Sequence, residues 1–310
     1  MNGQRLEATS GTKGLRKKRR SRSVPYMAAT VRLTERDVSV FSALLRTRFL
    51  STSLVALLFF GNSRWAANKS LRRLLNAGYV KVWVRSLTLD NVYSLTRRGL
   101  DALAIDDLDN PRSKTAAPRR LDGNLDHLLM LNRVRIMLAL SLPACGGEII
   151  SWRSDWEMPR LRHGVAPDAI FSLRWDRERE RTFCLEVDHR TRNHRRFLEK
   201  ILRYRSLQYG TVLGDSTADL SILVVGEDPV WIERYRRVLA ATGLQAPVWF
   251  TTVADLNMSG ALGAIWHSSD CDRAHSLRTG GSLPCGKEDR DRGAVVMAPT
   301  CTAAAARPWT

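Results

Sequence analysis

Two runs of alternating apolar and polar residues lie near the middle of the chain. The first follows Pro167, the second follows Phe183, and the charged residues 176–181 separate them. Side chains alternate between the two faces of a β-strand, and a short polar segment between two such runs is typical of a turn. The pattern therefore predicts a β-hairpin.

The register of this hairpin follows from a turn centred in the charged segment. Asp168 is then opposite Glu186 on one face, and Phe171 is opposite Phe183 on the other, apolar face, which is predicted to pack against helices. Directly opposed carboxylates have Cβ atoms roughly 5 Å apart and repel unless a cation lies between them. The first face is therefore predicted to bind a divalent metal ion, with Asp188 as a further oxygen ligand.

Apolar positions at helical spacing predict three helices between residues 34 and 78. Thr34 and Ser63 are expected to cap the first and third helices, and Gly78 is expected to end the third. The second helix is predicted over Ser51 to Phe60. The inward positions are predicted to be Val38, Phe41, Leu44 and Leu45 in the first helix, and Ala67, Leu71, Leu74 and Leu75 in the third. Two strands, Tyr79 to Arg85 and Val92 to Leu95, are predicted to follow, with Val80, Val82 and Val84 on one face.

Three helices and a β-ribbon are typical of a winged helix-turn-helix, predicted here over residues 31–104. This motif places its third helix in the major groove of DNA, where Arg and Asn side chains contact base edges. The candidate residues on that helix are Arg64, Asn68, Lys69 and Arg72, and the ribbon adds Lys81 and Arg85 as candidate phosphate contacts.

The remainder of the chain predicts a second domain over residues 122–255, with the order α-β-β-β-α-β-α-β, so the fold class is α+β / α/β. The apolar run Leu220 to Val225 is typical of a central strand. Three segments lack periodicity: a basic arm (1–30) and a C-terminal tail (256–310), both predicted to be disordered, and a linker (105–121).

Charge indicates the partner. The 310-residue chain has 49 Lys and Arg against 31 Asp and Glu, a formal net charge of +18, which favours a polyanion such as double-stranded DNA. We expect no membrane partner, because the apolar run Leu54 to Phe60 is too short to span a bilayer and the basic N-terminus does not resemble a secretory signal. Five scattered cysteines form no disulfide framework and favour the cytoplasm.

The Pro167-Asp168 pair, the Glu186-Val-Asp188 sequence and the spacing Lys200-x-x-x-Tyr204 resemble the PD-(D/E)xK nuclease-like fold. More narrowly, they resemble the replication-relaxation family of bacterial plasmids and mobile elements, and the likeness covers Thr34 to Val253. The resemblance implies that Asp168 and Glu186 are metal ligands, with Mg²⁺ as cofactor and Mn²⁺ as a substitute. It also implies action in plasmid or mobile-element replication or DNA relaxation, with replication or mobilisation proteins as partners.

The sequence departs from the nuclease pattern at Asp188, where active nucleases usually carry lysine. Lys200 can supply an ammonium from the next helix, on a face shared with Arg196 and Arg203, which are further candidate DNA contacts. Three alternatives follow. In the first, a magnesium-dependent site nicks DNA and consists of Asp168, Glu186, Asp188 and Lys200. In the second, the same site binds DNA or metal without cutting. In the third, the protein is a winged-helix transcriptional regulator without catalytic activity.

Overall fold

The computed structural model describes residues 31–86, 88–103, 124–158, 167–175, 179–189, 193–208, 220–243, 247–269, 271 and 273–278. The fold is mixed α+β, as predicted. Its N-terminal part comprises α1 (Glu35–Thr47), β1 (Leu50–Ser51), α2 (Thr52–Phe59), α3 (Arg64–Asn76), β2 (Val80–Trp83), β3 (Val92–Leu95) and α4 (Arg97–Asp101). Its C-terminal part comprises α6 (Leu125–Ser141), β4 (Glu148–Ser154), β5 (Ala169–Trp175), β6 (Arg179–Asp188), α7 (His194–Gln208), β7 (Ser221–Gly226), α8 (Pro229–Ala240), β8 (Val248–Thr252), α9 (Val253–Ser259), β9 (Trp266–Ser268) and β10 (Ala274–His275).

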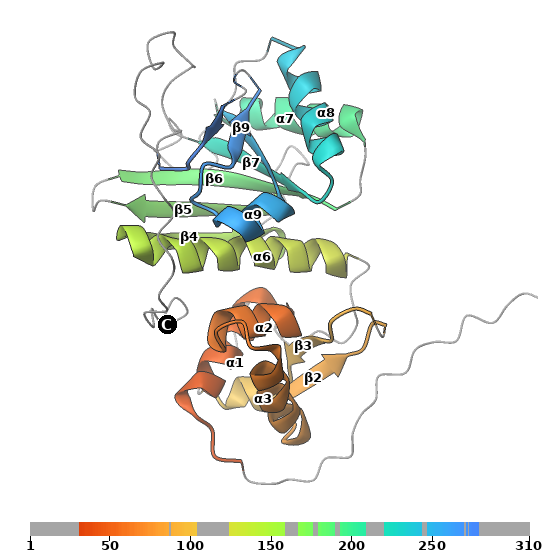
Figure 1. The fold of residues 1–310 in the computed structure, drawn as a ribbon, viewed down its shortest axis with the longest axis vertical. Helices are drawn as coiled ribbons and strands as arrows, with labels where there is room; N and C mark the ends of the chain where they lie inside the picture. The colour runs from red at the N-terminus through yellow and green to blue at the C-terminus, as the bar shows by residue number, and fades with distance from the viewer. Residues whose placement is uncertain are drawn as a thin grey trace, which may run out of the picture.

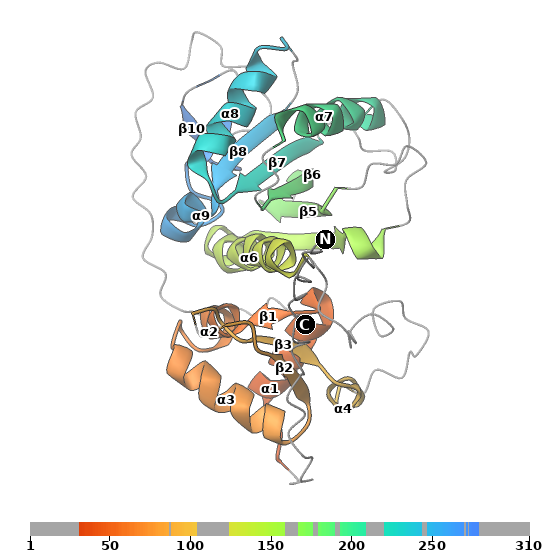
Figure 2. The same ribbon diagram turned by 90° about the vertical axis from the view of Figure 1, so that its right-hand side faces the viewer.

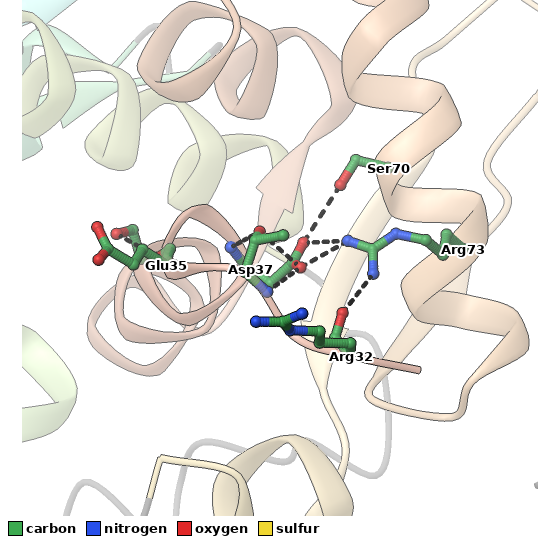
Figure 3. A network of polar contacts seen from close by, with 7 residues as sticks. Arg32, Glu35, Asp37, Ser70 and Arg73 are labelled. Carbon is green, nitrogen blue, oxygen red and sulfur yellow. Dashed lines mark hydrogen bonds and ion pairs between the residues drawn. The ribbon is translucent and has the colours of Figure 1, made fainter. Parts of the chain in front are cut away.

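A buried carboxylate joins α1 to α3 in the N-terminal part. Asp37 accepts hydrogen bonds from the backbone and side chain of Thr34, which completes the predicted capping box. Both Asp37 oxygens lie 2.6 Å from Nη2 of Arg73 on α3, and Arg73 also donates to the carbonyl of Arg32 (Figure 3). Burial opposes ionisation of Asp37, but these bonds prevail, so its pKa lies below the usual value.

The three strands of the N-terminal part form a sheet in the order β1-β3-β2. The prediction of inward-facing valines was wrong at Val84, which is 57% exposed, and at Val38, which is also exposed. The strand ends at Trp83, whose indole is buried and donates from Nε1 to Oγ of Ser94. Trp83 packs with Phe49 at the side that faces α6, so contact with the C-terminal part decides which face of β2 is inside.

The C-terminal part contains a mixed seven-stranded sheet with the order β10-β9-β8-β7-β6-β5-β4. The predicted element order is confirmed from α6 to β8, and the predicted hairpin register is confirmed, with Phe171 paired with Phe183 and Ile170 with Cys184. Helices α6 and α9 cover one face, and α7 and α8 cover the other (Figure 1). The face that carries Glu186 is therefore a second core and not an open acidic surface.

Helix α6 lies between the two parts (Figures 1 and 2). Its Asn132, 2% exposed, donates from Nδ2 to the carbonyls of Thr47 (3.0 Å) and Phe49 (2.8 Å). Arg135 donates to the carbonyl of Arg46 and lies over the Trp152 ring. These bonds satisfy carbonyls in the last turn of α1 and at Phe49, directly after the helix; the carbonyl of Thr47 also accepts the N–H of Phe49.

The segment Leu125–Cys145 is longer than the apolar run considered from sequence. By length and composition alone it is long and apolar enough to cross a membrane. In this structure its side chains belong to both cores, with Leu131 and Leu138 packed against the sheet and Ile136 and Ala139 packed against the N-terminal part. This packing is that of a central core helix.

The prediction of a disordered tail from residue 256 was wrong for the described residues up to 278. Helix α9 and strands β9 and β10 lie there, and Trp266, Ile265 and Leu277 are buried in the core beside α6. The apolar residues of this segment are too few and irregularly spaced to show a period. The predicted arm (1–30), the linker (105–121) and the rest of the tail lie outside the described residues.

Candidate acidic site and nucleic-acid interface

Glu186 is the centre of a buried polar cluster between β6 and α7. Lys200 and Tyr204 are four residues apart on α7, so both side chains point from the same side of the helix to the sheet. The Lys200 ammonium donates to Oε2 of Glu186, and the Tyr204 hydroxyl donates to Oε1. Lys200, predicted to supply a cation from the next helix, thus contacts Glu186. Tyr204 contacts the same carboxylate.

Asp168 lies directly before β5, beside Glu186. Its Oδ2 accepts the N–H of Val187 at 2.7 Å, and its Oδ1 lies 3.3 Å from Nε2 of His127 on α6. His127 was not among the predicted site residues. The signal in the sequence was a polar pair, Asp126-His127, at the start of an otherwise apolar helix.

The two carboxylates have opposite electrostatic environments. Burial and the charge of Asp168 raise the pKa of Glu186 to about 8, and the Lys200 ammonium offsets this only in part. Burial also opposes ionisation of Asp168, but the bond from His127 and the charge of Lys200 prevail and lower its pKa. The pKa of His127 is raised: burial would lower it, but the contact with Asp168 outweighs that effect. Asp168 is therefore the stronger acid of the two carboxyl groups, and Glu186 is the weaker acid.

Asp188 is on the same face of β6 as Glu186, as predicted, but it has a different partner. Its Oδ2 accepts a hydrogen bond at 3.0 Å from the Tyr235 hydroxyl of α8. Within the described ranges, no group of three or more His, Cys, Asp or Glu side chains is arranged to hold a metal ion. The geometry thus offers a divalent ion two neighbouring carboxylates, Asp168 and Glu186, and does not add Asp188 as a third ligand.

A second candidate surface is the outer side of α3. Ala67, Leu71 and Leu74 face the core, and the predicted DNA contacts Arg64, Asn68, Lys69 and Arg72 are exposed. Arg64 also pairs with Asp90, in the segment between β2 and β3, and Asp90 accepts the N–H of Ser53 at the start of α2. These contacts join the start of α3 to the β2–β3 hairpin, with α3 on the side remote from α6 (Figure 2).

The two candidate ribbon cations have partners within the protein. Lys81 Nζ lies 3.7 Å from the centre of the Trp83 ring, and burial lowers its pKa. The Arg85 guanidinium pairs with Asp126 at the start of α6. Arg196 and Arg203 are exposed on α7. The structure therefore brings four predicted DNA contacts together on α3 and places the other four elsewhere.

Comparison with known proteins identifies the family to which this chain is similar. The replication-relaxation family model matches residues 41–214, which include most of the N-terminal part and the chain through α7. No curated protein and no solved structure matches the chain. Because the match spans more than half of the chain and includes Asp168, Glu186 and Lys200, this protein belongs to the replication-relaxation family.

Proposed function

We propose that this protein binds double-stranded DNA through α3 and acts in the replication or relaxation of plasmid or mobile-element DNA. Family membership supports the process, and the order α1-β1-α2-α3-β2-β3 supports a winged helix-turn-helix. The net charge of +18 supports a polyanionic partner.

One observation carries this proposal. The outward side of α3 presents exposed arginine, lysine and asparagine at helical spacing, while its other side is buried in the core. Asp37 and Arg73 hold the helix against α1, so the exposed side chains project from a fixed support. A rigid helix with Arg and Asn outward is suited to the major groove, where those side chains form paired hydrogen bonds with guanine and adenine.

Fluorescence anisotropy with labelled duplex DNA tests the proposal. Arg72→Ala removes a proposed contact and is expected to weaken binding about tenfold, in line with about 1–3 kcal/mol for a base-contacting arginine. Arg237→Ala, an equal change of charge on α8, is expected to leave affinity close to wild type. Failure of the wild-type protein to bind duplex DNA would refute the proposal.

Strand cleavage is a second candidate function, favoured by the meeting of Asp168, Glu186 and Lys200 in one site. When bound there, Mg²⁺ would supply Lewis-acid chemistry to a phosphodiester. Asp168 and Glu186 would hold it, and Lys200 would release Glu186 to pair with a phosphate oxygen. Because Asp188 is held by Tyr235, we do not assign it a catalytic role.

Supercoiled plasmid, incubated with the protein and with Mg²⁺, Mn²⁺ or EDTA, separates cutting from binding. Cleavage predicts conversion to open circles only with metal, and its loss in Glu186→Gln. Intact plasmid under all conditions, with duplex binding retained, would favour the binding protein without cleavage. A transcriptional regulator would in addition show strong preference for one operator sequence over random DNA of the same length.

A further inference from the structure

The outer side of α3 also carries a large exposed aromatic residue. Trp65, in the first turn of the helix, is 74% exposed. Tryptophan is highly buried on average, and exposed aromatic side chains are enriched at binding sites. Asn68, Lys69 and Arg72 surround it on the same side of the helix, so the surface combines one apolar ring with hydrogen-bond donors and positive charge.

A cation also restricts the ring. Lys69 Nζ lies 5.3 Å from the centre of the Trp65 ring, within the range of a cation–π contact. Lys69 is one turn further along α3, so the contact favours an indole orientation along the helix axis. The remaining exposed area of the ring is then available to a ligand without a large loss of conformational freedom.

We infer that Trp65 contacts the 5-methyl group of a thymine in the major groove, and that the DNA site of this protein contains thymine at that position. The inference rests on the proposed binding of duplex DNA. Residues at the start of a recognition helix reach base edges, and the thymine methyl is the apolar group that the major groove presents. In this arrangement the positive side chains around Trp65 contact the phosphates that flank the major groove. These contacts position the ring over the base edges.

Replacement of thymine by deoxyuridine tests the inference, because it removes only the methyl group. A duplex selected from a random pool for binding to the wild-type protein is resynthesised with each thymine replaced in turn. Wild-type affinity is expected to fall about three- to fivefold at one or two positions, the effect of one buried methyl group. Trp65→Ala is expected to bind the thymine duplex about tenfold more weakly, as for a central aromatic contact, and to be indifferent to replacement at those positions.

Two variants serve as controls. Trp65→Phe keeps an aromatic ring and is expected to retain part of the sensitivity to the methyl group. Met258→Ala removes another exposed apolar side chain, 76% exposed on α9, and is expected to behave as wild type.

The outcomes that contradict the inference differ from those that contradict DNA binding itself. If Arg72→Ala weakens binding but Trp65→Ala does not, the duplex proposal stands and the role of Trp65 is wrong. Sensitivity to deoxyuridine that persists in Trp65→Ala would assign the methyl contact to another residue. Tighter binding to single strands than to duplexes, lost in Trp65→Ala, would indicate base stacking and overturn the major-groove contact.

Discussion

Two buried carboxylates, Asp37 and Glu186, each hold a helix in position through side chains from another segment. Asp37 binds Arg73 of α3, and Glu186 binds Lys200 and Tyr204 of α7. A buried carboxylate that loses its partner remains desolvated without compensation, so removal of one partner costs more than the pair contributes. Both helices are therefore sensitive to single substitutions at these contacts.

Asp37→Asn is expected to destabilise the protein by about 2 kcal/mol at neutral pH, the scale of a hydrogen bond to a charged group. Folding lowers the pKa of Asp37 below 3.8, so its contribution is present above that pH and is lost as pH falls through the folded-state pKa. The difference from wild type should therefore shrink in urea titrations below about pH 3.8. Asp101→Asn, at an exposed pair with Arg97, should differ from wild type by less than about 0.5 kcal/mol.

Lys200→Met removes the cation from Glu186 and is expected to cost about 3 kcal/mol of unfolding free energy, as for a broken buried ion pair. The double variant Glu186→Gln/Lys200→Met removes both charges and is expected to recover much of that loss. Urea denaturation of the two variants and wild type measures the difference. A double variant that is less stable than Lys200→Met would contradict the importance of the pair.

At the scale of elements, α6 connects parts of the molecule with separate hydrophobic cores. Asn132 donates to the carbonyls of Thr47, the last residue of α1, and of Phe49, directly before β1. The first turn of α6 also pairs Asp126 with Arg85 and His127 with Asp168. One helix thus contacts the β2–β3 hairpin, the end of α1 and the acidic site. Its polar residues determine how the N-terminal part is attached.

Asn132→Ala removes one of two donors to the carbonyl of Thr47, which keeps the N–H of Phe49, and removes the Asn132 donor from the buried carbonyl of Phe49; it is expected to cost about 2–3 kcal/mol. Asn132→Asp retains the volume but replaces the donor with an acceptor, so it should destabilise at least as much. In both variants, the increase in amide hydrogen exchange relative to wild type should be larger in α1 than in β6 and β7. If Asn132→Asp were as stable as wild type, donation to these carbonyls would not be what attaches α1.

At the scale of the whole molecule, positive charge exceeds negative charge by 18, and part of that excess lies on the exposed side of α3. The acidic site lies on the far side of α6 from this helix, between β6 and α7 (Figures 1 and 2). Binding through α3 and chemistry at Glu186 can therefore be altered separately.

The salt dependence of DNA binding tests the contribution of that charge. Each phosphate contact adds about 0.9 to the slope of log affinity against log salt concentration. Lys69→Ala/Arg72→Ala is therefore expected to reduce the slope by up to about 1.8, if both side chains contact phosphates. Removal of two exposed arginines elsewhere, Arg97 and Arg237, should leave the slope unchanged. Equal slopes for both double variants would mean that Lys69 and Arg72 do not contact phosphates.

The sequence by itself determined the local features of this protein. Thr34 and Ser63 cap their helices, and the pairing of Ile170 with Cys184 follows from alternation around one turn, because these features depend on neighbouring residues. The exposed side of α3 follows in the same way from the periodicity of the helix.

Only the tertiary structure decided which partners those residues have. Trp83 is inside and Val84 outside because α6 covers that side of β2, and Arg85 pairs with Asp126 for the same reason. The His127–Asp168 and Tyr235–Asp188 contacts join residues 41 and 47 positions apart in the chain. Such contacts form where helices pack against the sheet. Periodicity along the chain shows which face of an element is apolar, but it does not specify which other element covers that face.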